Sequence, residues 1–161
     1  MTATNAMNPD TFKRLVECYK EFLGDRLSSI VLFGSRARGD AKEGSDYDLF
    51  IAAEELPIKP FKRVLFIRSP LKGQFPEKFC IIAKTPAEIM KDFPPLFLEL
   101  GLDGIILFDR GDFFKKLQVR IREIIQQAGL QRKIEKGEFY WAWENSPQKG
   151  WEIKWSGFRE L

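Results

Sequence analysis

Two short apolar segments on either side of a polar, glycine-flanked loop constrain the fold of this chain more than any other feature of its sequence. The first segment, 29–33, is rich in β-branched and aromatic residues and ends at a glycine, and the second, 46–52, is of the same kind. Both patterns are typical of buried β-strands. Because the connection between them is short, we expect the two strands to be antiparallel.

The rest of the chain interleaves helical and strand patterns, which indicates an α+β (α/β) architecture. Apolar residues at helical spacing, capping residues and terminal glycines predict the helices, and continuous apolar runs predict the strands. The expected helices cover 10–23, a short part of 54–74, 86–91, the residues after Pro95, and 112–128. The expected additional strands cover 78–83 and 104–108.

The C-terminal tail differs in character, because aromatic residues alternate with polar ones in 139–143 and again in 151–155. A turn-forming stretch, 145–150, separates the two runs, so the pattern predicts a C-terminal aromatic β-hairpin. Its apolar face would carry Phe139, Trp141, Trp143, Trp151, Ile153 and Trp155. We expect this face to pack on the domain rather than to stack nucleic-acid bases. The prediction is a domain over 1–130 and a hairpin extension over 131–161.

Composition excludes several kinds of chemistry. The 161 residues include no histidine, which removes histidine general bases, Ser-His-Asp and Cys-His sites, and histidine-ligated metals. The two cysteines, Cys18 and Cys80, are too few for a four-cysteine zinc site or a disulfide framework, and we expect both to be reduced. Carboxylates, hydroxyls and backbone groups remain, and they favour a hard metal ion such as Mg²⁺.

Charge and hydropathy say less about function. With 26 basic and 23 acidic residues, the formal net charge of +3 is too small to indicate nucleic-acid binding by itself. Cations gather between 59 and 84, where they would serve a triphosphate, an RNA or a protein acceptor, or form a solvated surface. RNA binding is not favoured. The sequence has no signal-peptide layout and no membrane-length apolar run, so we expect a cytoplasmic protein with no membrane partner.

The loop between the first two strands carries the residues best suited to chemistry. Gly34 and Ser35 end the first strand, and their small side chains let backbone N–H groups approach an anion. Asp46 and Asp48 lie two apart, so a strand places both carboxylates on one face and Tyr47 on the other. Paired carboxylates favour a cation between them, and Mg²⁺ binds one or two carboxylates together with phosphate oxygens. Each feature alone is common on solvated strands and turns, but the combination indicates attack on a nucleotide's phosphorus.

This segment resembles the G-S-x10-D-x-D signature of the polymerase-beta-type nucleotidyltransferase superfamily, and especially its minimal nucleotidyltransferase branch. The close match covers Gly34–Gly39 and Ser45–Leu49, and a looser similarity reaches about Leu130. The resemblance implies a minimal nucleotidyltransferase fold, with a mixed, mostly antiparallel sheet flanked by helices. It also implies Mg²⁺-dependent transfer of a nucleoside monophosphate from an NTP, with ATP expected, to a hydroxyl acceptor.

The resemblance also implies roles for individual residues. Gly34 and Ser35 would contact the nucleotide's phosphates, flanked by Arg36 and Arg38, and the catalytic carboxylates Asp46 and Asp48 would hold the metal ion. Some minimal members of the family are antitoxins that adenylylate a HEPN-type toxin. A HEPN-type protein is therefore a candidate partner.

One expected residue is missing. The family carries a third carboxylate on the next strand, but here that strand is 78–83 and the matching position is Phe79 or Cys80. Glu77 is the nearest acid and the candidate catalytic base, although a glutamate at the start of a strand is more often a solvated surface residue. The alternative to an enzyme is therefore a catalytically degenerate nucleotide-binding or antitoxin-like module.

Overall fold

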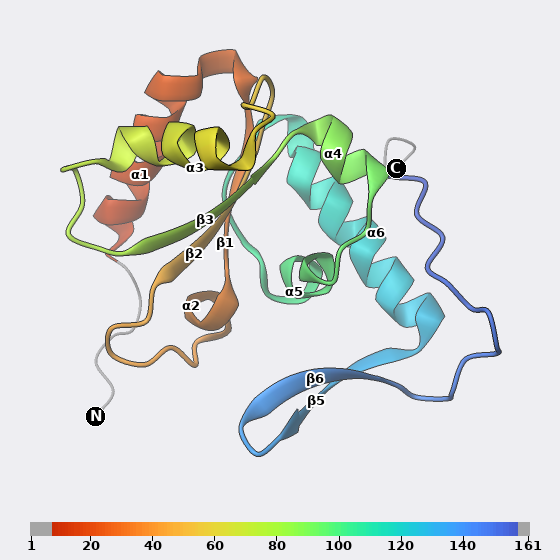
Figure 1. Cartoon of the computed structure of the whole chain (residues 1–161). Helices are drawn as coiled ribbons and strands as arrows, with labels where there is room; N and C mark the ends of the chain where they lie inside the picture. The colour runs from red at the N-terminus through yellow and green to blue at the C-terminus, as the bar shows by residue number, and fades with distance from the viewer. Residues whose placement is uncertain (1–7, 158–161) are drawn as a thin grey trace.

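The computed structural model describes residues 8–157 and has a four-stranded sheet at its centre (Figure 1). The strand order is β3-β2-β1-β4. β1 (Leu27–Phe33) pairs antiparallel with both β2 (Tyr47–Ala53) and β4 (Ile105–Asp109). β2 pairs in parallel with β3 (Phe79–Lys84). The mixed, mostly antiparallel sheet expected from the sequence is confirmed, as is the antiparallel pairing of the first two strands.

Helices cover both faces of the sheet. They are α1 (Pro9–Leu23), α2 (Gly34–Arg38), α3 (Pro60–Arg68), α4 (Pro86–Lys91), α5 (Leu96–Asp103) and α6 (Phe113–Ala128), with 3₁₀ turns η1 (Gly24–Arg26), η2 (Ser69–Leu71) and η3 (Arg110–Asp112). Local signals set several boundaries: the Asn8 side chain caps the start of α1, and Thr85 and Glu88 form a capping box on α4. The structure confirms the helices that the sequence predicts.

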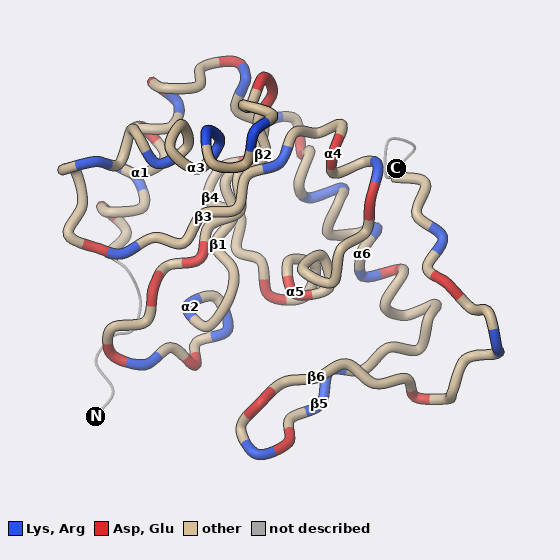
Figure 2. Tube along the Cα trace, viewed as in Figure 1, with Lys and Arg blue, Asp and Glu red and all other residues tan. Residues whose placement is uncertain are grey.

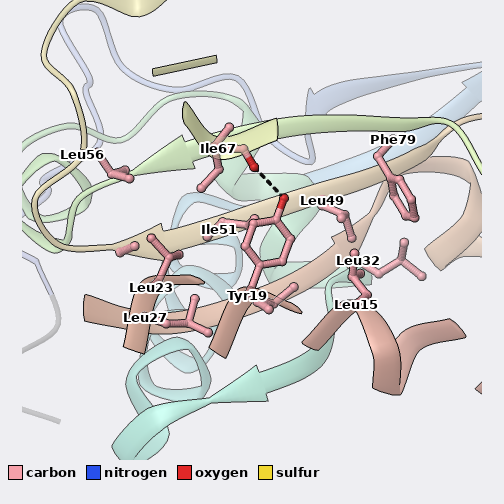
Figure 3. Close-up of a cluster of buried hydrophobic side chains, with 12 residues drawn as sticks. Leu15, Tyr19, Leu23, Leu27, Leu32, Leu49, Ile51, Leu56, Ile67 and Phe79 are labelled. Atoms are coloured by element: carbon pink, nitrogen blue, oxygen red, sulfur yellow. Dashed lines mark hydrogen bonds between the residues drawn. The ribbon is translucent and has the colours of Figure 1, made fainter. Parts of the chain in front are cut away.

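Alternation along the central strands creates two hydrophobic cores. Ile30 and Leu32 of β1 point into a core formed with α1 and α3, whereas Val31 and Phe33 point into a core formed with α5 and α6. Figure 3 shows the first core, where the buried Tyr19 hydroxyl donates a hydrogen bond of 2.9 Å to the Ile67 carbonyl. Burial raises the pKa of Tyr19 well above its usual range, so the phenol stays protonated and ties α1 to α3.

The C-terminal hairpin is present, but its strands differ from those expected. β5 (Leu130–Glu135) pairs with β6 (Glu138–Trp143), so the predicted pairing of 139–143 with 151–155 is wrong. The physical reason is the two-residue turn at Lys136 and Gly137, whose φ angles of 52° and 82° match the twist of a tight hairpin. The longer, proline-containing stretch 145–150 cannot close a hairpin as tightly, and residues 144–157 form neither helix nor strand.

The tail's tryptophans therefore do not share one face. Trp141 and Trp155 pack against the second core, and the Trp155 Nε1–H donates to the Ile89 carbonyl at 3.1 Å. Trp143 and Trp151 contact each other with ring centroids 5.8 Å apart, and both stay partly exposed. The division into 1–130 and 131–161 stays a prediction. None of the helices described has the length and apolar character needed to cross a bilayer.

Candidate functional site

Asp48 faces the bend between β1 and α2. It pairs with Phe33 across the antiparallel ladder, which brings its side chain beside Gly34 at the end of β1. A Cβ atom on Gly34 would collide with the Asp48 carboxylate, and the φ angle of Gly34 is +71°. Only glycine combines this backbone conformation with such a close approach. The acid of the second strand and the glycine–serine bend therefore form one site.

Asp46 lies one residue before β2 and adds negative charge to this site. Burial raises the pKa of the Asp48 carboxyl above its ordinary value, and the nearby charge of Asp46 raises it further. Glu99 of α5 acts in the same direction, while a hydrogen bond from Cys80 and the charge of Arg38 oppose the shift. The raised pKa of Asp48 shows that its negative charge is unfavourable beside Asp46 and Glu99, and a cation bound there would neutralise this charge.

Two arginines flank the bend in different ways. The Arg36 guanidinium lies over the Tyr47 ring, 4.4 Å from its centroid, and donates to the Ser45 carbonyl at 2.8 Å, so it supports the loop that precedes β2. Arg38 forms ion pairs with Asp40 at 3.1 Å and with Glu99 at 3.8 Å. Tyr47 packs toward the first core, on the opposite side from the carboxylates, as strand alternation predicts.

A cavity of about 620 Å³ opens beside this bend, within the size range of small-molecule sites. Its lining comes from the bend and from the C-terminal hairpin: Gly34, Ser35, Arg38, Asp48, Arg132, Phe139 and Trp141 are among its residues. Figure 1 shows the hairpin leaving the end of α6 and reaching toward the end of the sheet that carries α2. Sequence reasoning missed this contribution, since it assigned the tail only a packing role. The sequence signal that could have located this hairpin is the two-residue turn at Lys136 and Gly137.

Contacts to α2 and α5 hold the hairpin in place. Arg132 of β5 forms a two-pronged ion pair with Asp103 at the end of α5, with Nη2 donating to Oδ1 at 3.0 Å. The Phe139 ring lies near two guanidinium groups, 4.9 Å from Arg38 and 5.0 Å from Arg132. Such cation–π contacts add to the ion pair and link the hairpin to the bend.

Cys80 occupies the position next to Asp48 on the parallel neighbour. In the β2–β3 register Asp48 pairs with Cys80, whereas Phe79 pairs with Tyr47 and is buried in the first core. Of the two positions that the sequence left open for the missing third carboxylate, Cys80 is therefore the one beside the site. Burial raises the pKa of the Cys80 thiol, and the charges of Asp48 and Asp46 raise it further, so the thiol stays protonated. Both cysteines are free.

Glu77 does not line the cavity that contains Ser35 and Asp48. It lines a second cavity of about 900 Å³, which Asp46 and Cys80 also line. Its Oε2 atom is buried and has no hydrogen-bond partner among the residues that the structure describes. An unpaired buried carboxylate oxygen is costly, which makes Glu77 more than an ordinary surface glutamate.

The acids of the site fit a metal ion that arrives with its substrate. Within residues 8–157 there is no group of three or more acidic or cysteine side chains arranged to hold a metal ion. Mg²⁺ does not need one, because it is usually bound through one or two carboxylates, with substrate phosphates and water completing its shell. The repulsion between the charges of Asp46 and Asp48 favours binding of such a cation.

Known proteins resemble the chain in sequence. Residues 17–94 match the family model described as polymerase beta, nucleotidyltransferase. A candidate protein adenylyltransferase of Methanocaldococcus jannaschii, MJ1305, is 36% identical over 118 residues, which cover 70% of this chain and 79% of that protein. A second one from the same organism, MJ0141, is 40% identical over 63 residues, which cover 34% of this chain and 64% of that protein.

Solved structures resemble the chain in fold. One is a crystal structure of a toxin–antitoxin with AMP-PNP, with a TM-score of 0.51, 16% identity, and coverage of 72% of this chain and 87% of that chain. Another is a tri-AMPylated Shewanella oneidensis HEPN toxin in complex with MNT antitoxin, with a TM-score of 0.50, 14% identity, and coverage of 75% and 88%. At these identities the likeness extends to the fold alone.

Proposed function

Since this chain belongs to the polymerase beta nucleotidyltransferase family, we propose that it transfers an adenylyl group from ATP to a hydroxyl of an acceptor, with Mg²⁺ as cofactor. The observation that carries the proposal is the Asp48 carboxylate against Gly34, beside a cavity of about 620 Å³. This arrangement puts an anion-binding bend and a cation-binding acid within reach of one nucleotide.

Different residues of the cavity would bind different parts of the nucleotide. In this proposal the phosphates lie along Gly34 and Ser35, where the first N–H groups of α2 have no partner within the helix. Arg38 contributes positive charge on the same side. Asp46 and Asp48 would hold Mg²⁺, which neutralises charge on the phosphates when it is bound. The hairpin residues Phe139 and Trp141 also line this cavity.

The proposed reaction is a single displacement at the α-phosphorus. The oxygen of the acceptor hydroxyl forms a bond to that phosphorus, and the bond from the phosphorus to the bridging oxygen breaks, so pyrophosphate leaves. We assign the hydroxyl proton to Glu77, the carboxylate that lines the second cavity beyond Asp46. General-base help of this kind is worth about 10²–10⁴-fold in rate.

We propose a protein as the acceptor, because the relative that shares 36% identity is a candidate protein adenylyltransferase. The similar solved structures include a complex of a HEPN toxin with an MNT antitoxin. A HEPN-type protein is therefore the partner we would test first.

Label transfer from ATP provides the test. With ATP labelled at the α-phosphate, Mg²⁺ and a HEPN-type protein, we expect labelled AMP on that protein, and Asp48→Asn should lower the rate by at least about 100-fold because it removes a metal-binding charge. Asp25→Asn makes the same chemical change at an exposed site outside both cavities and should have no effect. Transfer by Asp48→Asn at the rate of the unmodified protein would contradict the proposal.

The second candidate function is a nucleotide-binding module without turnover, acting as the partner of another protein. The observation that favours it is Cys80, which stands beside Asp48 where the family carries its third carboxylate. In that case MgATP would quench tryptophan fluorescence, through Trp141 in the cavity wall, without any labelled AMP appearing on an acceptor.

A further inference from the structure

The outer side of α3 is apolar, which is unusual for a helix on a protein surface. Phe61, Val64 and Leu65 follow helical spacing and are 74%, 48% and 56% exposed, and Ile58 just before the helix is 91% exposed. Only Ile67 of this helix is buried. We call these four exposed residues the α3 face. Contiguous exposed apolar surface of this kind marks interaction sites.

Lysines lie at the α3 face and in the lining of the second cavity. Lys59 is the N-cap residue of α3 and Lys62 belongs to this helix, whereas Lys72 and Lys78 line the cavity. Lys59, Lys62, Lys72 and Lys78 are exposed, and none of them forms an ion pair in the part of the chain that the structure describes. Figure 2 shows basic positions recurring along α3 and in the segments that follow it. An acidic partner would therefore meet unpaired positive charge around an apolar centre.

The α3 face continues into the second cavity. Leu65 and Arg68 line this cavity, and its lining also includes Asp46, Glu77 and Cys80. A polypeptide anchored on the α3 face could therefore place one side chain beside Asp46 and Glu77, in the second cavity.

We propose that the α3 face and the second cavity form the docking site of the acceptor protein, and that its docking segment is acidic with apolar anchors next to the modified hydroxyl. This inference rests on the proposed function. The apolar centre favours a protein over RNA, because single-stranded RNA is held mainly by cations and stacked aromatic rings and the α3 face offers one aromatic ring. The cations favour a partner with negative charge, and the apolar residues provide the surface that is buried when the partner binds.

Two fluorescent synthetic peptides test the charge selection without requiring turnover. Both contain tyrosine next to leucines, one flanked by aspartate and glutamate and the other by lysine. In fluorescence anisotropy with the full chain, we expect the acidic peptide to bind at least about tenfold more tightly than the basic one. Equal binding of the two peptides, or no binding of either, would overturn the inference.

Surface variants test the location. Lys62→Glu with Lys72→Glu, and separately Phe61→Ser, should each weaken binding of the acidic peptide about fivefold to tenfold. The matched control, Lys13→Glu with Lys116→Glu, reverses two exposed lysines on α1 and α6 and should leave peptide binding unchanged. If the control weakens binding as much as the α3 variants do, the site is wrong.

Other occupants would give distinct results, each of which contradicts the inference. Tighter binding of a single-stranded oligouridylate than of the acidic peptide, lost in the Lys62/Lys72 variant, would assign the surface to RNA. A dimer by light scattering that Phe61→Ser converts to monomer would assign it to a second copy of the chain. Failure of the proposed function is distinguishable, because the unmodified chain would then transfer no AMP, or Asp48→Asn would transfer it at an unchanged rate, while peptide binding stays intact.

Discussion

Gly34 couples backbone conformation to the position of the key acid. We predict that Gly34→Ala destabilises the fold by about 1–2 kcal/mol, because a Cβ is unfavourable at positive φ, and that it also displaces Asp48 and sharply lowers AMP transfer. Urea denaturation and label transfer measure the two effects. Gly39→Ala separates them, since Gly39 has a φ of +83° but nothing within 4 Å of an added Cβ. Equal transfer rates in the two variants would show that the Asp48 contact is unimportant.

Cys80 allows a gain of function to be tested. We predict that Cys80→Asp raises the rate of AMP transfer, because it restores a carboxylate beside Asp48 at the position that pairs with it across the β2–β3 ladder. The gain should stay below the ~10²–10⁴-fold typical of a general base, because the proposed function already assigns that role to Glu77. Single-turnover transfer measures it, with Cys80→Asn as the control of similar shape without a charge. A variant no faster than the original chain would show that a carboxylate at this position does not assist the transfer.

Single residues differ in how far the sequence alone could locate them. Gly34, Ser35, Asp46 and Asp48 could be identified because their signature is local, and one strand–loop–strand unit fixes their geometry. The choice between Phe79 and Cys80 could not be made, because it depends on the register of a parallel pairing between distant segments. The assignment of these residues to catalysis and metal binding stays a prediction.

At the scale of elements, the two-residue turn of the β5–β6 hairpin determines which segments of the tail pair as strands. The period-two pattern located one strand, 138–143, but could not say which segment would pair with it. The strand that does pair, 130–135, is polar and mostly exposed, so it carries no apolar signal. Turn geometry at Lys136 and Gly137 outweighed the aromatic pattern of 151–155.

The anchoring of this hairpin can be tested at Arg132. We predict that Arg132→Ala lowers the free energy of unfolding by about 1–3 kcal/mol, because it leaves the largely buried Asp103 carboxylate without its partner. MgATP affinity should fall as well, since the cavity wall loses its attachment to α5. Arg120→Ala is the control, because its pair with Glu123 is a spacing of three residues on one helix, worth less than about 1 kcal/mol. Equal losses in the two variants would refute the anchoring role.

At the scale of the whole molecule, the irregular segment 144–157 holds the C-terminal part against the rest. Trp155 packs beside Phe93 and Phe97, with ring centroids 5.2 and 6.1 Å away. The overall sheet and both cores follow the apolar periodicity of the sequence, but this contact joins residues with no shared local pattern. For that reason the sequence predicted packing of the tail without predicting where it packs.

We predict that Trp155→Ala lowers the free energy of unfolding by about 1–3 kcal/mol, through loss of apolar contact and of the hydrogen bond to Ile89. Trp151→Ala removes the same type of side chain where it is 40% exposed and should cost less. Thermal unfolding monitored by circular dichroism measures both. A larger loss for Trp151→Ala would place the anchor of the tail elsewhere.

The distance along the chain between the bend and the hairpin has a consequence for biosynthesis. A ribosome delivers Gly34 and Asp48 well before Phe139 and Trp141, which line the same cavity. A nascent chain that still lacks the hairpin would leave the acids without this part of the cavity lining, and we expect it to bind a nucleotide weakly. In the proposed function, competence to bind would thereby be deferred until the hairpin has been synthesised.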